Sequence, residues 1–231
     1  YATTTGTETE TTITVSCGTA SATTTLKVIE SVASSYVVGD IILTNGTKVS
    51  VNDVTTYTID ENNKPIGVIA MISDVYGFPT PKAVGLSSGN LMWAPIWSVG
   101  YGTYFANIVC KPSQTGPGAA LTATFTGDTD GSDNWEYICR IDAEDTQDAA
   151  TNYPIFNFAN TYGTTAGLTG TDYENGWYVP SIAELCEVYK NKEVIQTSLT
   201  KAGGFTFVTS LNPDYWSSSQ NASNNDGASR V

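Results

Sequence analysis

The stretch GWYVPSIAEL, residues 176–185, predicts the end of a strand that turns into a capped helix. Ser181 precedes a helical run and Glu184 follows three residues later. This is the spacing of a capping box, in which the serine side chain accepts from the amide at N3 and the glutamate reaches back to the cap amide. Pro180 ends the strand, because proline and the residue before it resist helical conformation. We therefore expect a helix that runs to about Asn191.

Two segments carry apolar residues at i, i+3, i+4 and i+7, the spacing of one buried helix face. In the capped helix the four positions are Ile182, Leu185, Cys186 and Tyr189. In the earlier segment they are Ile155, Phe158, Ala159 and Tyr162. Pro154 either opens the earlier helix or kinks a longer one that starts near Asp145, and Gly163 suits its C′ position. The sequence thus predicts two amphipathic helices.

Strand patterns surround these helices. Residues 37–43 and 48–51 flank Asn45-Gly46, a dipeptide typical of a two-residue hairpin turn. Residues 64–72 form a continuous apolar run that we interpret as a strand buried on both faces. Residues 73–127 hold many Gly, Pro and aromatic residues, so we expect irregular loops with short strands there. A further short strand is expected at residues 205–208.

The N-terminal segment, residues 1–33, is Thr-rich and alternates with period two, as strands do. Its composition resembles the last hairpin of a bacterial Ig-like domain, and a Thr-rich stalk or an added edge hairpin is the alternative. Two strands are too few for a stable unit alone. Residues 31–35 are interpreted as a linker, and residues 36–231 as the main domain.

The chain has 231 residues, a net charge of −13, a pI near 4.1 and only 14% charged residues. Its ten basic residues are scattered, which argues against nucleic acid and anionic membranes as direct partners. No apolar run approaches the roughly 18 residues of a membrane span. The polar, uncharged composition favours an extracellular or cell-surface protein. Because the first residue is Tyr1 and not Met, a lipid anchor on a removed N-terminus is one alternative.

The chain contains no histidine, which excludes a Ser-His-Asp triad, a Cys-His pair and an H-E-x-x-H zinc site. Its cysteines are Cys17, Cys110, Cys139 and Cys186. They form no C-x-x-C pair, which argues against structural zinc. We interpret them as isolated small hydrophobic residues, with disulfides in one of three connectivities as the alternative.

Residues 128–133, DTDGSD, are acidic and turn-prone. An EF-hand loop anchored on Gly131 would require Glu at Tyr137, so that pattern fails. A looser Ca²⁺ site from Asp128, Asp130 and Asp133 is the alternative to a solvated acidic turn. We therefore expect no cofactor, with Ca²⁺ as the one candidate.

Four short motifs occur in order along the chain: Asp133-Asn134-Trp135; Tyr153-Pro154-Ile155-Phe156 with Tyr162-Gly163; Gly176-Trp177-Tyr178-Val179-Pro180-Ser181 with Glu184-Leu185; and Tyr215-Trp216-Ser217-Ser218-Ser219. Together they resemble C-type lectin-fold domains of the formylglycine-generating-enzyme type. Within these, the chain is most similar to the variable proteins of diversity-generating retroelements, bacterial and phage surface receptors with a hypermutated C-terminal segment. The resemblance implies an α+β fold, with two helices around short, twisted, mostly antiparallel sheets.

The resemblance also implies a ligand surface on the last strands and loops, with a variable segment at about residues 213–231. In that family, adenine-directed mutagenesis recodes Asn-type codons into Asn, Ser, Tyr, Asp and Gly codons, and the C-terminal segment has this composition. The implied ligand-binding residues are Tyr215, Trp216, Ser217, Gln220, Asn221, Ser223, Asn224, Asn225 and Asp226. Trp216 also matches the motif as a structural anchor. Family members usually continue with further strands, so we expect part of the variable surface to lie beyond Val231.

The expected function is a surface receptor or adhesin module that binds a protein ligand on another cell or molecule. Tyr, Ser, Asn and Gly are also the residues that antibody paratopes use. The alternative is a carbohydrate-binding module, with or without the help of Ca²⁺, in which four aromatic residues stack on sugars: Trp93, Trp97, Tyr101 and Tyr104.

An enzyme is the third hypothesis and the one least favoured. The fold is named after an enzyme that oxidises a cysteine of sulfatases. That enzyme needs reactive cysteines of its own. Cys139 and Cys186 lie in an expected strand and an expected helix stripe. Paired carboxylates could serve a glycosidase, and the candidate pairs are Asp133 with Glu136 and Glu184 with Glu187. Exposed helix acids have the same spacing without any function, so we expect no enzymatic activity.

Overall fold

In the computed structural model, the described residues are 8–17, 20–29, 36–75, 78–116, 118–207, 215–220 and 228–230, with the backbone alone for 8–29, 74–75, 78 and 228–230. They form a mixed α+β structure of short helices and small antiparallel sheets. The α+β class expected from the sequence is therefore confirmed.

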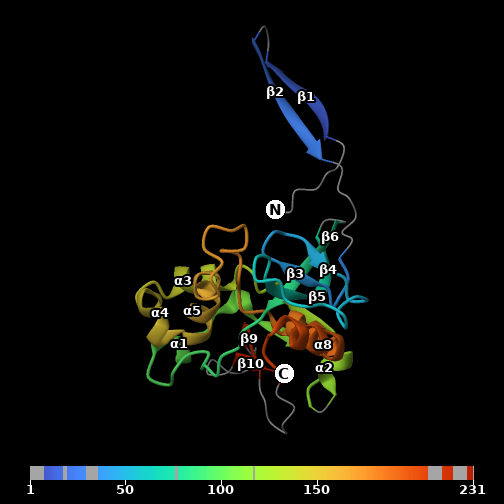
Figure 1. Ribbon diagram of the computed structural model, residues 1–231. Coiled ribbons are helices and arrows are strands. Elements are labelled where there is room, and N and C mark those ends of the chain that lie inside the picture. The colour runs from blue at the N-terminus through green and yellow to red at the C-terminus, as the bar shows by residue number, and fades with distance from the viewer. Residues whose placement is uncertain are drawn as a thin grey trace.

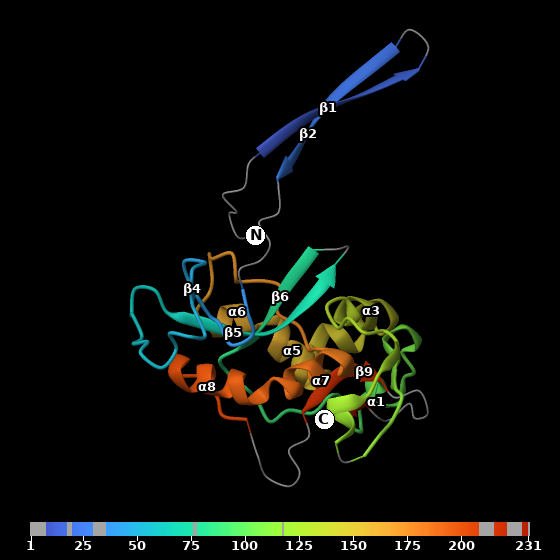
Figure 2. The same ribbon diagram turned by 90° about the vertical axis from the view of Figure 1, so that its right-hand side faces the viewer.

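The N-terminal strands β1 (Glu8–Cys17) and β2 (Ala20–Ile29) pair antiparallel along their full length, from Glu8 opposite Ile29 to Cys17 opposite Ala20. This confirms the predicted strand pair. In Figures 1 and 2 the hairpin extends away from the rest of the chain. The predicted linker at residues 31–35 lies outside the described residues. Whether the hairpin belongs to an Ig-like domain stays a prediction.

The central sheet has the strand order β4-β3-β5-β6. Its strands are β3 (Ile41–Leu43), β4 (Lys48–Val49), β5 (Pro65–Val75) and β6 (Phe78–Gly85). The predicted turn at Asn45-Gly46 is confirmed, because Gly46 has a positive φ of 81° and its N–H donates to Leu43 O at 2.9 Å. Along β5, Val68 and Ile69 point to opposite faces and are both buried, as the apolar run predicts.

Two consecutive helices, α7 (Ile182–Lys190) and α8 (Lys192–Ala202), lie along one side of the central sheet (Figure 2). The capping box is confirmed: Glu184 N donates to Ser181 Oγ at 3.2 Å, and Ser181 N donates to Glu184 Oε2 at 2.9 Å. Helix α8 was not predicted. It buries Ile195 and Leu199 against the sheet and ends at Gly203, where φ is 74°.

The predicted apolar stripe of α7 is wrong at its last position. Tyr189 is exposed, and Lys192 Nζ lies 4.1 Å from its ring centroid. Val188 is buried in the central-sheet core instead. Glu184 is also buried, one turn before Val188, because Lys82 from the sheet pairs with it. The face of α7 that packs on the sheet therefore includes a carboxylate, that of Glu184. The spacing of apolar residues alone does not reveal this.

A second core is built mainly from aromatic side chains, which we call the aromatic core: Trp93, Phe105, Trp135, Tyr153 and Phe156. It lies between α3 (Asn134–Ile141), α5 (Pro154–Asn160) and the loops before them. Pro154 occupies the first turn of α5, so it opens the helix rather than kinking a longer one. Most ring pairs meet at steep angles, the arrangement that aromatic quadrupoles favour.

The sequence analysis placed Gly163 just after the end of the earlier helix. This prediction is wrong, because Gly163 lies inside the short helix α6 (Tyr162–Thr165). A Cβ at this position would lie 1.9 Å from the carbonyl oxygen of Glu174. The glycine therefore permits close approach of two backbone segments, and its conformation is not left-handed.

Short elements complete the described chain: α1 (Val99–Gly102), η1 (Ala106–Ile108), β7 (Cys110–Pro112), α2 (Ala119–Thr122), β8 (Phe125–Gly127), η2 (Asp145–Asp148), α4 (Ala149–Asn152), β9 (Trp216–Gln220) and β10 (Ala228–Arg230). The irregular region predicted at 73–127 is confirmed, apart from the eight-residue β6 and the two short helices.

Three strand predictions are wrong. Cys139 lies in helix α3 rather than in a strand, and residues 176–180 and 205–207 form no strand among the described residues. The reason at 205–207 is packing: Phe205 N donates to Leu86 O, and the rings of Phe205 and Phe207 pack on the central-sheet core.

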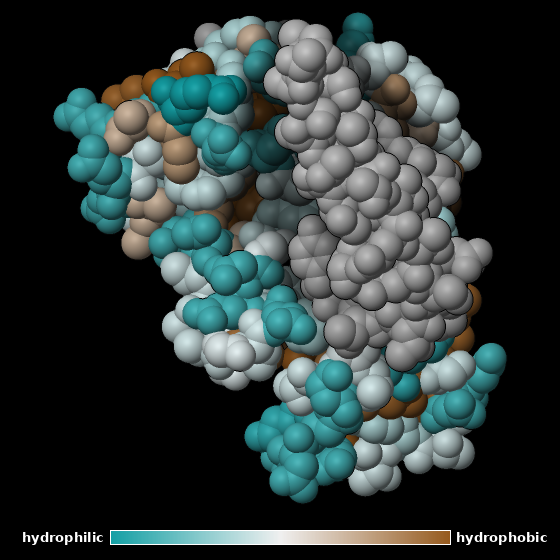
Figure 3. Space-filling view, turned by 90° about the horizontal axis from the view of Figure 1, so that it is seen from above, coloured by the Kyte–Doolittle hydropathy of each residue, from teal (hydrophilic) through white to brown (hydrophobic). Residues whose placement is uncertain are grey.

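None of the helices in the described part of the chain has the length and apolar character needed to cross a membrane. Seen from above, the described surface is mostly hydrophilic, with hydrophobic residues in small separate groups (Figure 3).

Candidate functional site

Strand β9 is polar in sequence but buried. Ser217, Ser218 and Ser219 are fully buried and Gln220 is 1% exposed. The strand pairs antiparallel with β10, with Ala228 opposite Gln220. The prediction that Ser217 and Gln220 are displayed to a ligand is therefore wrong. A buried hydroxyl or amide is tolerated when its hydrogen bonds are made inside the protein.

Hydrogen bonds from two neighbouring elements fix the serines of β9. Asn134 Nδ2 of α3 donates to Ser218 Oγ at 2.8 Å. Ile182 N, at the start of α7, donates to Ser219 Oγ at 3.0 Å. The backbone N–H of Ser218 donates to Pro180 O at 2.7 Å. The Ser219 hydroxyl and the Ser218 backbone N–H thus join the strand to the start of the capped helix, and the Ser218 hydroxyl joins it to α3.

Gln220 binds the loop before η1 with both ends of its amide. Phe105 N donates to Gln220 Oε1 at 2.7 Å, and Gln220 Nε2 donates to Thr103 O at 2.7 Å. Its backbone also forms an isolated parallel bridge with Val109. The end of β9 is therefore attached to residues 103–109.

The other predicted ligand-binding residues divide into two groups. Tyr215 and Trp216 are partly exposed; the ring of Tyr215 lies 5.8 Å from that of Phe207, and Trp216 packs against the aromatic core. That packing agrees with Trp216 as a structural anchor. The remaining five lie outside the described residues, in the segment that links β9 to β10: Asn221, Ser223, Asn224, Asn225 and Asp226.

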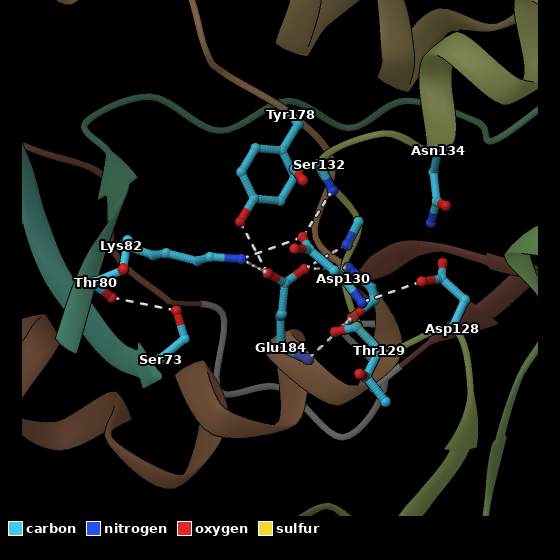
Figure 4. Close-up of polar contacts among 12 residues, drawn as sticks. Ser73, Thr80, Lys82, Asp128, Thr129, Asp130, Ser132, Asn134, Tyr178 and Glu184 are labelled. Atoms are coloured by element: carbon cyan, nitrogen blue, oxygen red, sulfur yellow. Dashed lines mark hydrogen bonds and ion pairs between the residues drawn. The ribbon is translucent and has the colours of Figure 1, made fainter. Parts of the chain in front are cut away.

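An ionic network surrounds the buried carboxylate of Glu184 at the start of α7 (Figure 4). Lys82 reaches from β6 to Glu184 Oε1 at 2.5 Å and to Asp130 Oδ1 at 3.2 Å. Tyr178 Oη donates to Glu184 Oε1 at 2.8 Å, and Gly131 N donates to Glu184 Oε2 at 2.9 Å. Glu184 thus joins the sheet, the acidic turn and the helix cap, a role that the capping motif alone did not reveal.

The protonation of this network follows from its contacts. Burial alone would lower the pKa of Lys82, but hydrogen bonds to Glu184 and Tyr178 outweigh it and raise the pKa. Burial and the Glu184 carboxylate raise the pKa of Tyr178. The lysine therefore stays charged and the tyrosine stays neutral at physiological pH. Neither group is poised to exchange a proton near neutrality, as a general acid or base must be.

The acidic turn at residues 128–133 uses its carboxylates internally. Asp130 Oδ1 accepts from Ser132 N at 3.1 Å and contacts Lys82, and Asp128 Oδ1 accepts from Asp130 N at 3.2 Å. Among the described residues, no group of three or more His, Cys, Asp or Glu residues is arranged to hold a metal ion.

Three cysteines have described side chains, and all three carry free thiols. Cys110 and Cys186 are buried in one small apolar cluster. Burial raises the pKa of Cys110 to about 11, and burial also raises the pKa of Cys186 and of Cys139. A reactive thiol needs a lowered pKa and access to solvent, so these environments are those of structural cysteines.

A pocket of about 600 Å³ lies beside β6, and it is lined mainly by apolar and aromatic side chains. Tyr162 and Trp177 face it with ring centroids 4.4 Å apart. Lys82 and Glu184 also line it, but they are paired with each other. The pocket has the size of a small-molecule site, yet its charged groups are already satisfied.

The four aromatic residues proposed for sugar stacking differ in their exposure to solvent. Trp93 is buried in the aromatic core and Tyr101 packs against it, whereas Trp97 is 70% exposed and Tyr104 is 47% exposed. Trp97 and Tyr104 are therefore the two exposed members of this set, and Tyr101 is partly buried. The sequence did not distinguish the two pairs, because all four lie in one segment rich in glycine and proline.

Comparison of the chain with protein-family models, curated proteins and solved structures gives no match.

Proposed function

We propose that this protein is a ligand-binding surface receptor or adhesin module whose segment 221–226 contacts a protein partner. The observation that carries the proposal is the burial of strand β9. The side chains of Ser218, Ser219 and Gln220 already make hydrogen bonds to α3, α7 and the loop before η1. The ligand surface then begins where the buried strand ends.

Such an arrangement suits a binding segment that varies. Binding residues are often placed on loops that a rigid scaffold positions. Here the residue before the segment, Gln220, is attached by both ends of its side-chain amide, and strand β10, which follows the segment in sequence, pairs with β9. Its sequence, NASNND, is rich in the adaptable polar residues of paratopes. Changes in that segment would leave the contacts of β9 in place.

The fold that fits this proposal is the C-type lectin fold of the formylglycine-generating-enzyme type, in a variable protein of a diversity-generating retroelement. Support comes from two sequence motifs that meet in space: the capped helix α7 and the WSSS strand are joined by the bond from Ile182 N to Ser219 Oγ. The proposed location is the cell surface or the extracellular space, and the proposed partner is a protein on another cell or molecule.

The test replaces residues 221–226 with glycine and serine in the whole chain. Peptides selected from a phage-displayed random library on the wild-type protein serve as the probe. We expect the selected peptides to lose binding to the variant while its melting temperature stays unchanged. Equal binding to both proteins would refute the proposed role of the segment.

The genome offers an independent test of the family. A near-duplicate of the coding segment for residues 215–231, differing only at adenines and lying beside a reverse-transcriptase gene, would establish the retroelement. Non-adenine differences throughout the duplicate would argue against it.

A second candidate function is carbohydrate binding, favoured by the exposed rings of Trp97 and Tyr104. A glycan array probed with and without a chelator tests it. Binding that disappears with the chelator would support a Ca²⁺-assisted lectin, and silence across a broad array would reject it.

A further inference from the structure

Two Asn-Gly pairs occur in the sequence, Asn45-Gly46 and Asn175-Gly176. An asparagine followed by glycine is prone to spontaneous deamidation, because glycine has no side chain to hinder attack of its backbone nitrogen on the asparagine amide. Both asparagines are exposed. Neither the dipeptide nor its exposure distinguishes the two sites, so a difference between them must come from how the fold holds each backbone.

The hairpin between β3 and β4 holds the first pair with several hydrogen bonds. Gly46 N, the atom that would attack, donates to Leu43 O at 2.9 Å. Asn45 Oδ1 accepts from Thr47 N at 2.9 Å and from Thr47 Oγ1 at 2.6 Å. Asn45 N donates to Asn63 Oδ1 at 3.1 Å. Attack of Gly46 N on the Asn45 side chain would break bonds on both reacting groups, so the fold protects this pair.

The second pair is not held in this way. In the described part of the chain, no hydrogen bond is formed by Asn175 or by Gly176. Gly176 has a φ of 92°, and a Cβ built on it would meet nothing within 4 Å. The backbone therefore has free space for the rotation that brings Gly176 N to the Asn175 side-chain carbon, and the rotation breaks no bond.

The residues on either side of the second pair are fixed. Trp177 Nε1 donates to Tyr173 O at 2.7 Å and so closes a short loop that has Asn175 at its centre. The Trp177 ring also lies 4.4 Å from the ring of Tyr162, measured between centroids. The backbone at Glu174 packs directly on Gly163. Asn175 and Gly176 are therefore the free part of a loop whose base is anchored.

We propose that Asn175-Gly176 is a site of spontaneous deamidation in the folded protein, and that the hairpin protects Asn45-Gly46 from the same reaction. The modification needs no enzyme and no cofactor. It is independent of the proposed function, because it involves neither strand β9 nor segment 221–226.

The reaction at Asn175 has two steps. Gly176 N loses its proton to hydroxide and attacks Asn175 Cγ; a C–N bond forms, the bond from Cγ to Nδ2 breaks, and the nitrogen leaves as ammonia with a proton from water. Water then opens the cyclic imide at either carbonyl. Opening at the backbone carbonyl gives isoaspartate, and opening at Cγ gives aspartate. The net change consumes one water and converts an amide into a carboxylate and ammonium.

The product would alter the pocket beside β6. Asn175, Gly176 and Trp177 all line that pocket. Deamidation replaces a neutral amide there by a negative charge next to Glu174. The isoaspartate form also adds a methylene group to the main chain between Tyr173 and Trp177, where the indole bond closes the loop. The modification therefore changes both the charge and the backbone of the pocket lining.

The experiment incubates the whole wild-type chain in mildly alkaline buffer and follows both pairs by peptide mapping with mass spectrometry. Chromatography of the peptides separates aspartate from isoaspartate. We expect Asn175 to be lost at least about tenfold faster than Asn45, because the reaction at Asn45 must first break hydrogen bonds. Both aspartate and isoaspartate should appear at position 175, since an imide opens in both directions.

Two controls separate the fold from the local sequence. In concentrated urea the hairpin bonds are absent, so both pairs should react at similar rates. The variant Asn175→Gln keeps a neutral amide but lengthens the side chain, which disfavours the ring closure. It should retain the wild-type melting temperature and give no product at this position.

Three results would overturn the proposal. Equal rates at the two pairs in the folded protein would show that the hairpin gives no protection. A difference that persists in urea would belong to the local sequence and not to the fold. Aspartate without isoaspartate at position 175 would mean direct hydrolysis of the side chain, without attack by Gly176 N.

Discussion

Strand β9 and the segment at residues 96–104, a loop that includes the one-turn helix α1, show the reverse of the usual relation between composition and burial. The strand has the sequence WSSSQ, and its three serines and its glutamine are buried. The loop contains isoleucine, tryptophan and valine, and it exposes all three. In the strand, hydrogen bonds inside the protein replace those to water. In the loop, the apolar side chains have no neighbours in the described chain that would cover them.

This difference shows that the number of available partners decides burial at these sites, more than hydropathy does. A hydroxyl costs little to bury when a backbone N–H points at it, as Ile182 N points at Ser219 Oγ. The comparison leads to four tests on stability.

The largest effect should distinguish two tryptophans in one loop. Trp93→Ala removes a ring that packs at 5.2 Å from Phe156 in the aromatic core, and it should lower the free energy of unfolding by about 3–5 kcal/mol. Trp97→Ala removes an exposed ring and should change it by no more than about 0.5 kcal/mol. Urea unfolding measures both, and similar losses would show that Trp97 is also part of the core.

Glu184 should rank second. Glu184→Ala leaves the N–H groups of Gly131 and Ser181 without their acceptor and breaks the pair with Lys82, at a cost of about 3 kcal/mol. Glu187→Ala, on the same helix, removes an exposed pair with Lys190 and should cost less than about 0.5 kcal/mol. Equal effects on thermal unfolding would contradict the structural role of the buried network.

The third test concerns the attachment of β9 to residues 103–105 through the Gln220 side chain. Gln220→Ala leaves Phe105 N and Thr103 O without their partners, so the unfolding free energy should fall by about 2 kcal/mol. Gln147→Ala, which removes an exposed bond to Ala143 O, is the matched control and should be nearly neutral. Hydrogen exchange at Phe105 should accelerate in the Gln220 variant alone; unchanged exchange would mean that the amide does not hold the loop.

The smallest effect concerns Asp128 and has the opposite sign. Burial, with repulsion from Asp133 and Asp130, raises the pKa of Asp128 above its usual value in the folded protein. The folded state therefore favours the protonated form, and the wild type loses stability as pH rises through that pKa. Asp128→Asn should be more stable by about 0.5 kcal/mol at neutral pH.

As pH falls toward about 3.9, the usual aspartate value, the advantage of Asp128→Asn should disappear. Chemical unfolding of both proteins at several pH values measures the difference. Parallel pH profiles would show that the carboxylate is not penalised by burial.

Local signals predicted several elements correctly. The capping box at Ser181, the turn at Gly46 and the opening of α5 by Pro154 each depend on bonds or backbone angles within a few residues. Helix α8 was missed although Ile195, Leu199 and Ala202 have the i, i+4, i+7 spacing, because polar and charged residues occupy most of its other positions. Its stability comes from the sheet that it covers.

The candidate site was predicted in part. Composition identified the C-terminal segment, but it could not tell which polar residues face inward. The burial of Gln220 depends on a donor and an acceptor that lie 115 and 117 residues away along the chain. The exposure of Trp97 next to the burial of Trp93 likewise depends on which ring meets Tyr153 and Phe156.

The sequence by itself determined the α+β class, the two capped or proline-opened helices and the hairpin turn, because these follow from contacts between near neighbours. Only the tertiary structure decided that a serine-rich strand would lie in the interior and an apolar loop at the surface. The physical reason is that burial of a polar group requires a partner, and the partners of β9 come from α3, α7 and residues 103–105.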